Sequence, residues 1–280
     1  MSTTIDIASY FSRQRQMPEL GEGALEKLQA ASVLVVGAGG LGCPALQYLA
    51  AAGVGNLIVV DVDTVEVSNL HRQLLFAPND VGRSKATVAA EKIQEQFLFT
   101  RITAYNETFT ADLGTQLLPQ VDLVLDCTDQ VHVKYLLDDL CLCLGKPWIF
   151  AAISGFEMQW GLCTADGLRY ASIFPVPPNP MHMRTCEQNG TIGVVPGMAA
   201  LFQVNLAIQF LTQQANIGCG MHYFDAMQGR KTFLDVQQNT EVIVPDLDTI
   251  LSKDYQKYIL DFHYKKEQHG CRKEDKKSIC

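Results

Sequence analysis

The sequence predicts an α/β fold with a doubly wound mixed sheet, parallel in its N-terminal half and extended by antiparallel strands in its C-terminal half. Up to residue 153, short apolar runs alternate with helical segments of ten to fifteen residues, the pattern of βαβ units. After residue 154, two strand-like segments follow with no helix between them, as antiparallel neighbours do. We expect one unit over residues 1–245, with halves at about 30–153 and 154–245, and a C-terminal helix and basic tail over 246–280.

Each element follows from its local pattern. Leu41 to Ala52 is apolar nearly all round, which predicts a buried helix, whereas the mixed run from Arg101 to Tyr105 predicts an edge strand. The other expected helices cover residues 85–97, 131–144 and 194–212. The other expected strands cover residues 33–36, 57–61, 121–127, 148–153, 156–164, 168–173, 223–227 and 231–236. Four prolines fall between residues 175 and 180, so residues 174–189 are expected to form a long functional loop.

Composition excludes several classes of protein. Apolar residues make up 48% of the 280 positions and charged residues 19%, enough apolar surface for a folded core. A net charge of −8 argues against nucleic acid as the main partner. The uncharged stretch 31–60 is broken by six glycines and Pro44, so we expect no membrane span there. Nine cysteines, never spaced Cys-x-x-Cys, and no secretory signal predict reduced thiols in a cytoplasmic protein.

A glycine-rich turn joins the first expected strand to the buried helix. Gly37, Gly39, Gly40 and Gly42 fit the spacing G-x-G-x-x-G, which lets bare backbone N–H groups approach a phosphate at a helix N-terminus. Asp61 ends the second strand, where an acid binds ribose hydroxyls in Rossmann-like sites. On this pattern alone, a dinucleotide-dependent oxidoreductase is the default, and a turn without a ligand is the alternative.

Charged residues beyond Asp61 favour a triphosphate instead. Arg72 and Lys85 supply fixed positive charge near the predicted ligand crevice, which a hydride-transferring cofactor has little need for. The carboxylates of Asp126 and Asp129 follow the next buried strand and suit Mg²⁺, although Asp129 could instead cap the helix that starts near Val131. Together these residues point to ATP chemistry.

At this point the chain resembles the ThiF/MoeB family, the bacterial relatives of ubiquitin-activating enzymes. The resemblance covers about residues 8–240. It rests on the segments Tyr10–Gln14, Gly37–Gly42, Val62–Gln73, Leu125–Asp129, Thr185–Cys186 and Phe224–Met227.

The resemblance implies a reaction and its partners. Members bind ATP and Mg²⁺ and adenylate the C-terminal glycine carboxylate of a small ubiquitin-like or sulfur-carrier protein ending in Gly-Gly, with release of pyrophosphate. The half at 30–153 would then bind the nucleotide, and the half at 154–245 the carrier protein. Members are homodimers, and neither nucleic acid nor a membrane is an expected partner.

Positions that match the family carry over its residue roles. Gly40 would lie against the phosphates, and Asp129 would hold magnesium and act as the catalytic acid. Arg72 and Lys85 would act on the triphosphate, while Arg13 would reach the site of the neighbouring subunit. The expected nucleotide-binding set is Gly37, Gly39, Gly40, Gly42, Asp61, Asp63, Ser68, Asn69, Leu70, His71, Arg72, Gln73, Lys85, Asp129 and Gln130.

Two departures from the family stand out. Many relatives hold a structural zinc with two Cys-x-x-Cys pairs, which should fall near residues 168–173 and 237–244, and neither segment contains cysteine. We therefore expect no zinc site. Gln130 stands where relatives usually have Asn, and its amide can make the same hydrogen bonds from one methylene further out.

Other questions stay open on the sequence. Cys186 stands where relatives can form a thioester or persulfide link with the carrier, yet adenylation itself needs no cysteine, so a spectator thiol is the alternative. No sulfur-transfer domain follows residue 240, so a separate sulfur donor is expected. The pathway is open among thiamine, molybdenum cofactor, another sulfur metabolite and protein conjugation. The alternative functions are an NAD-dependent oxidoreductase and a non-catalytic partner subunit.

Overall fold

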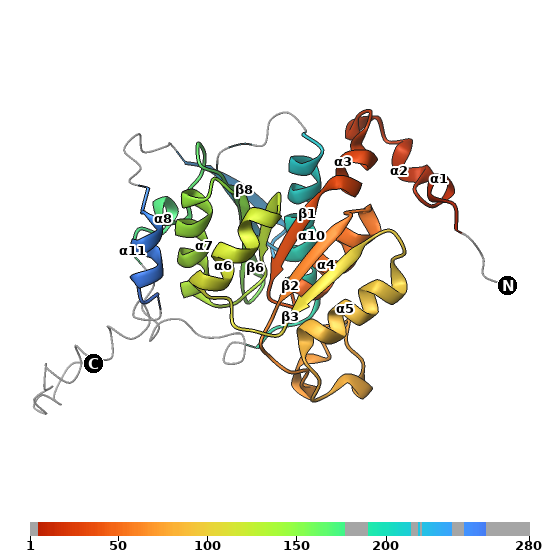
Figure 1. Cartoon of the computed structure of the whole chain (residues 1–280), viewed down its shortest axis with the longest axis horizontal. Coiled ribbons are helices and arrows are strands. Elements are labelled where there is room, and N and C mark those ends of the chain that lie inside the picture. The colour runs from red at the N-terminus through yellow and green to blue at the C-terminus, as the bar shows by residue number, and fades with distance from the viewer. Residues whose placement is uncertain (1–4, 177–189, 214–217, 219, 237–243, 256–280) are drawn as a thin grey trace, which may run out of the picture.

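The computed structural model describes residues 5–176, 190–213, 218, 220–236 and 244–255, which form an α/β structure around one mixed sheet (Figure 1). The sheet has eight strands in the order β3-β2-β1-β4-β5-β6-β7-β8. The strands β1 to β5 are parallel, and β6 to β8 are antiparallel additions. Their bounds are β1 Ser32–Val36, β2 Asn56–Val60, β3 Arg101–Tyr105, β4 Leu123–Asp126, β5 Trp148–Ser154, β6 Glu157–Cys163, β7 Gly220–Asp225 and β8 Arg230–Asp235. The predicted fold class is confirmed.

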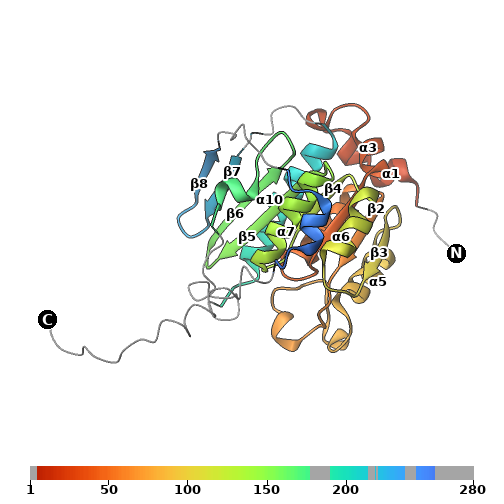
Figure 2. The same cartoon turned by 60° about the vertical axis from the view of Figure 1, so that its left-hand side comes forward.

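Helices cover both faces of the sheet (Figures 1 and 2). One apolar core lies under α4, α5 and α10, and the other lies under α6, α7 and α11. The helices are α1 Ile7–Tyr10, α2 Ser12–Arg15, α3 Ala24–Ala30, α4 Gly42–Ala52, α5 Lys85–Gln96, α6 Ala111–Leu117, α7 Val131–Cys143, α8 Tyr170–Ile173, α10 Val194–Leu211 and α11 Leu247–Ser252. The sheet runs without a break through the boundary that we placed near residue 153.

The glycine turn between β1 and α4 is held by close backbone packing. Gly37 has a φ of +95°, and a Cβ there would lie 2.9 Å from the carbonyl oxygen of Cys127, the residue after β4. A Cβ on Gly42 would lie 2.0 Å from the carbonyl oxygen of Gly37. Only glycine fits at these two positions, because any side chain would push the turn away from β4 or from α4.

One predicted strand is wrong. Residues 168–173 were expected to be extended, but only Leu168 makes an isolated β-bridge, and the chain then turns into the short helix α8. Asp138 of α7 explains the difference, because its buried carboxylate accepts hydrogen bonds from the backbone N–H groups of Tyr170 and Ala171 at 3.0 and 3.2 Å. Arg169 donates to the same carboxylate through Nε and Nη2 at 3.1 and 2.9 Å. A side chain on another element, which no local pattern reveals, thus bends this segment.

We expect Arg169→Met to destabilise the fold by about 3 kcal/mol, because it leaves the Asp138 carboxylate buried without its cation. Urea unfolding followed by circular dichroism measures the loss. Arg15→Met is the matched control: its ion pair with Glu26 is exposed and should contribute at most about 0.5 kcal/mol. Equal losses in the two variants would contradict a structural role for the Arg169 pair.

We expect Gly42→Ala to lower the free energy of unfolding by at least about 2 kcal/mol, because its Cβ overlaps backbone that cannot move aside. Gly39→Ala is the comparison within the same turn. Its Cβ meets only the Gln73 side-chain nitrogen, at an ordinary 3.7 Å, so its stability should change little. If Gly42→Ala unfolds at the same urea concentration as Gly39→Ala, the packing argument fails.

Candidate active site

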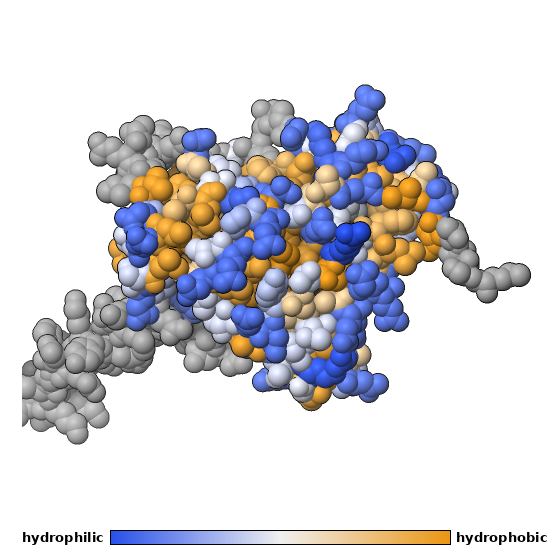
Figure 3. Space-filling model, viewed as in Figure 1, coloured by the Kyte–Doolittle hydropathy of each residue, from blue (hydrophilic) through white to orange (hydrophobic). Residues whose placement is uncertain are grey.

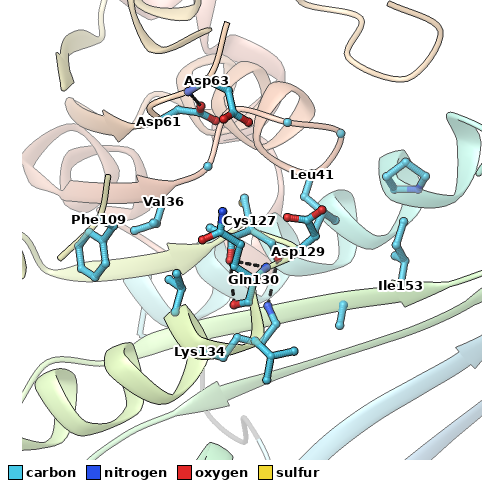
Figure 4. A pocket seen from close by; sticks show the side chains of 18 of the residues that line it. Val36, Leu41, Asp61, Asp63, Phe109, Cys127, Asp129, Gln130, Lys134 and Ile153 are labelled. Atoms are coloured by element: carbon cyan, nitrogen blue, oxygen red, sulfur yellow. Dashed lines mark hydrogen bonds between the residues drawn. The ribbon is translucent and has the colours of Figure 1, made fainter. Parts of the chain in front are cut away.

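A cleft of about 970 Å³ opens at the carboxyl ends of the parallel strands (Figure 4). It lies where the chain order of the strands reverses, between β1 and β4, the usual position of ligands in doubly wound sheets. Eleven of the predicted site residues line it: Gly37, Gly39, Gly40, Asp61, Asp63, Asn69, Arg72, Gln73, Lys85, Asp129 and Gln130.

The glycine turn forms a bare backbone wall of this cleft. Gly39 and Gly40 lie at its surface, directly before the N-terminus of α4. No Cβ stands between their N–H groups and the cleft, and a Cβ on Gly40 would lie 3.2 Å from Pro196. Backbone N–H groups at a helix N-terminus attract anions, so this wall suits phosphate groups.

Asp61 is braced by the turn that it faces. Its two carboxylate oxygens accept hydrogen bonds from the backbone N–H groups of Ala38 and Asp63, at 2.6 and 2.8 Å. Burial raises the pKa of Asp61 above its ordinary value, and these two hydrogen bonds offset part of that effect. Each oxygen keeps a second lone pair, which can accept from a ribose hydroxyl.

Lys85 and Arg72 place positive charge close to Asp63 and to the glycine turn. The buried Lys85 ammonium contacts the Asp63 carboxylate at 2.9 Å, and its other two N–H groups have no partner among the described residues. Arg72 donates through Nη1 to the Ser68 carbonyl at 2.8 Å and lies 3.0 Å from the His71 ring. Each cation is therefore held in place by one of its N–H groups, and its remaining N–H groups stay available for a ligand.

Asp129 enters the cleft from the loop that follows β4 (Figure 4). It is exposed, and its carboxylate has no hydrogen-bond or ion-pair partner within the described parts of the chain. The alternative role as a helix cap is wrong, because Gln130 holds the N-cap position of α7 and no side chain caps that helix. A single unpaired carboxylate facing a phosphate-binding turn fits Mg²⁺, which usually takes one or two carboxylates together with phosphate oxygens.

Sequence reasoning missed the rest of the lining. Lys134 of α7 forms a buried ion pair with Asp126, so Asp126 is not available to a metal ion. The sequence signal for Lys134 was a single basic residue in the mostly apolar start of the expected helix. Phe109 forms part of an apolar end, and it follows β3 at the same edge of the sheet (Figure 4). The far end reaches β5, β6 and β7 through Ile153, Met158 and Tyr223.

Other predicted residues lie outside the cleft. Gly42 lies beneath the turn, and Ser68 and His71 contact Arg72 rather than the cleft. Leu70 packs against the apolar core. Arg13 is exposed on α2 and does not line this cleft, and Cys186 falls outside the described residues.

Within the described lining, Cys127 is the one cysteine and does not suit nucleophilic chemistry. Its thiol is buried, and burial raises its pKa well above the ordinary value. The arrangement of a phosphate wall, two cations and an unpaired carboxylate instead suits reactions at phosphorus, which depend on positioning and charge neutralisation.

Comparisons with known proteins agree with this geometry. The family model described as "ThiF family" matches residues 11–243. The chain is 38% identical over 236 residues to a sulfur carrier protein adenylyltransferase of Thermus thermophilus, covering 82% of this chain and 87% of that protein. It is 41% identical over 224 residues to the adenylyltransferase and sulfurtransferase MOCS3 of Mus musculus, covering 78% of this chain but only 48% of MOCS3.

Among solved structures, E. coli MccB has the same fold. In the crystal structure with MccA-N7isoASN the TM-score is 0.74 at 18% identity, covering 86% of this chain and 75% of MccB. The crystal structure of MccB with ATP gives a TM-score of 0.69 at 20% identity, covering 79% of this chain and 68% of MccB. The likeness to MccB shows the fold alone. The family follows from the family model, which matches most of the chain. The chain belongs to the ThiF family.

Proposed function

We propose that this protein is an adenylyltransferase that activates the C-terminal glycine carboxylate of a small ubiquitin-like or sulfur-carrier protein. It uses ATP and Mg²⁺ and releases pyrophosphate. The similarity to the adenylyltransferases of Thermus thermophilus and Mus musculus supports this proposal. The activity extends from those proteins to this chain through the ThiF family.

One observation carries the proposal: a single cleft joins the phosphate wall, the two cations and Asp129, and continues onto the open sheet at Ile153 and Tyr223. An enzyme that joins a nucleotide to a protein tail needs such a continuous path, because the tail must reach the α-phosphate while its own domain stays outside. An oxidoreductase would leave Arg72, Lys85 and Asp129 without a role.

The residues divide the work by their chemistry. The magnesium ion would screen the phosphates, with Asp129 as its protein ligand. The N–H groups of Gly39 and Gly40 bind phosphate oxygens, and Asp61 orients the ribose. Arg72 and Lys85 stabilise the negative charge that develops as pyrophosphate leaves. No covalent enzyme residue is required for this step, because the carrier carboxylate is itself the nucleophile.

A homodimer with Arg13 in the neighbouring site is part of the proposal. Arg13 lies on a short arm with exposed apolar side chains nearby, including Tyr10 and Met17, and Figure 3 has a hydrophobic area beside this arm. In the described part of the chain, α10 is the one helix long and apolar enough to cross a membrane, but half of it is buried in the core, as in soluble proteins. Its exposed side, with Val194 and Leu201, suits packing against a second copy.

Several further expectations stay predictions: the cytoplasmic location, the division into two halves, a separate sulfur donor, the absence of zinc, and a step after adenylation at Cys186. Among the described residues, no group of three or more His, Cys, Asp or Glu side chains could hold a metal ion.

Asp129→Ala should reduce carrier-dependent ATP–pyrophosphate exchange at least about a hundredfold, because it removes the ligand of the ion that screens the leaving group. Exchange of labelled pyrophosphate into ATP, with a candidate carrier ending in Gly-Gly, measures the loss. Asp112→Ala, at an exposed carboxylate of α6 outside the cleft, is the control and should leave exchange unchanged. Exchange that survives in the Asp129 variant would remove this residue from the mechanism. A wild-type chain that is inactive with every carrier would favour the non-catalytic subunit.

Mixing Arg13→Ala protein with Asp129→Ala protein should restore part of the exchange that each lacks alone. In a mixed dimer one cleft carries both mutations, whereas the other receives an intact Arg13 from its neighbour and keeps its own Asp129. Sedimentation at the assay concentration must show dimers. A monomer that is active at the full rate would sink the shared-site proposal.

A further inference from the structure

The loop that carries Asp129 rests on a buried ion pair. The carboxylate of Asp126, at the end of β4, and the ammonium of Lys134, one turn into α7, are in contact, with exposed fractions of 0% and 2%. Two buried charges of this kind are costly unless every remaining donor and acceptor finds a partner. Their further contacts therefore show what the pair holds in place.

Lys134 uses all of its hydrogen-bond donors on the protein. Besides Asp126, its ammonium donates to the carbonyl oxygens of Thr128 and Ala151, at 3.2 and 3.1 Å. An ammonium has three N–H groups and no acceptor, so nothing is left for a nucleotide, although Lys134 borders the cleft. Lys134 thus joins the loop after β4 to the adjacent strand β5.

Asp126 holds the same loop from the other side. Its second carboxylate oxygen accepts from the backbone N–H and the hydroxyl of Thr128, at 3.0 and 2.8 Å. Gln203 of α10 donates to the Asp126 carbonyl at 2.9 Å. Thr128 is therefore fixed through its N–H, its hydroxyl and its carbonyl, while Asp129, the next residue, has no partner of its own among the described residues.

We propose that Lys134 is a positioning residue for Asp129, acting through Asp126 and Thr128 rather than on the nucleotide (Figure 4). The inference rests on the proposed function in one respect, that Asp129 is the acid facing Mg²⁺. The ion pair keeps the Thr128–Asp129 peptide in one orientation, so the unpaired carboxylate meets the metal without first being ordered. Supporting groups of this kind commonly change metal affinity 10- to 100-fold.

The test measures how much magnesium strengthens ATP binding to the full chain. Titration calorimetry gives the Kd for ATP in EDTA and in excess Mg²⁺, and their ratio is the magnesium gain. Lys134→Met should reduce this gain roughly tenfold while leaving the Kd in EDTA nearly unchanged. Lys146→Met is the matched control: Lys146 also donates to a backbone carbonyl, that of Val121, but before β4 and outside the cleft, so the gain should stay as in the wild type.

A double-mutant cycle separates positioning from a general structural effect. In an Asp129→Ala background, Lys134→Met should change the magnesium gain by less than about twofold, because the group on which it acts is gone. Circular dichroism checks folding. If Lys134→Met does not fold, Lys134→Met combined with Asp126→Asn, which leaves no buried charge unpaired, enters the same cycle with the same expectation.

Two results would overturn the inference. One is an equal loss of ATP affinity in EDTA and in Mg²⁺, and the other is independent effects of Lys134→Met and Asp129→Ala on the gain. Pyrophosphate exchange distinguishes this failure from that of the proposed function. If the wild-type protein catalyses exchange but Lys134→Met keeps the full magnesium gain, the positioning role alone is wrong. If Lys134→Met loses the magnesium gain but the wild-type protein activates no carrier, the positioning role is supported and the proposed adenylation reaction is wrong.

Discussion

The contact between the backbones after β1 and β4 is the constraint on which the site depends. Gly37 passes so close to Cys127 that no side chain fits between them, and this contact lies where the strand order reverses. It brings the glycine turn and the Asp129 loop into one cleft, although they are about ninety residues apart in sequence. Asp61 is tied to the same junction, because it accepts a hydrogen bond from the backbone N–H of Ala38 in the turn.

Each charged group of the site is held by the protein on one side and stays free to bind a ligand on the other. Asp61, Lys85 and Arg72 each make hydrogen bonds to neighbouring protein groups, and each has donors or acceptors left over for a ligand. Groups held in this way need little rearrangement when charge develops on the substrate, which is how a preorganised site stabilises a transition state. The buried and unreactive Cys127 fits the same design, because the reaction needs no enzyme nucleophile.

Sequence patterns predicted the features that depend on local periodicity and spacing. The parallel strands, the glycine turn and the edge position of β3 follow from runs of a few residues, whereas much of the lining of the cleft was predicted from the family resemblance. The failures share one physical cause, contact between side chains and backbone groups that belong to different helices and strands. Residues 168–173 have a strand-like composition, yet Asp138 bends them into α8. Lys134 gave a weak signal because its role depends on Asp126 and Ala151, which lie on two different strands.

Helix α7 connects these two unexpected features. Lys134 and Asp138 are four residues apart and so project from the same side of the helix, towards the sheet. The first holds the loop of Asp129, and the second holds Arg169 and the start of α8, whose Tyr170 also lines the cleft. The buried ion pair of Asp138 and Arg169 thus anchors the start of α8, and the same face of α7 also holds the loop that carries Asp129.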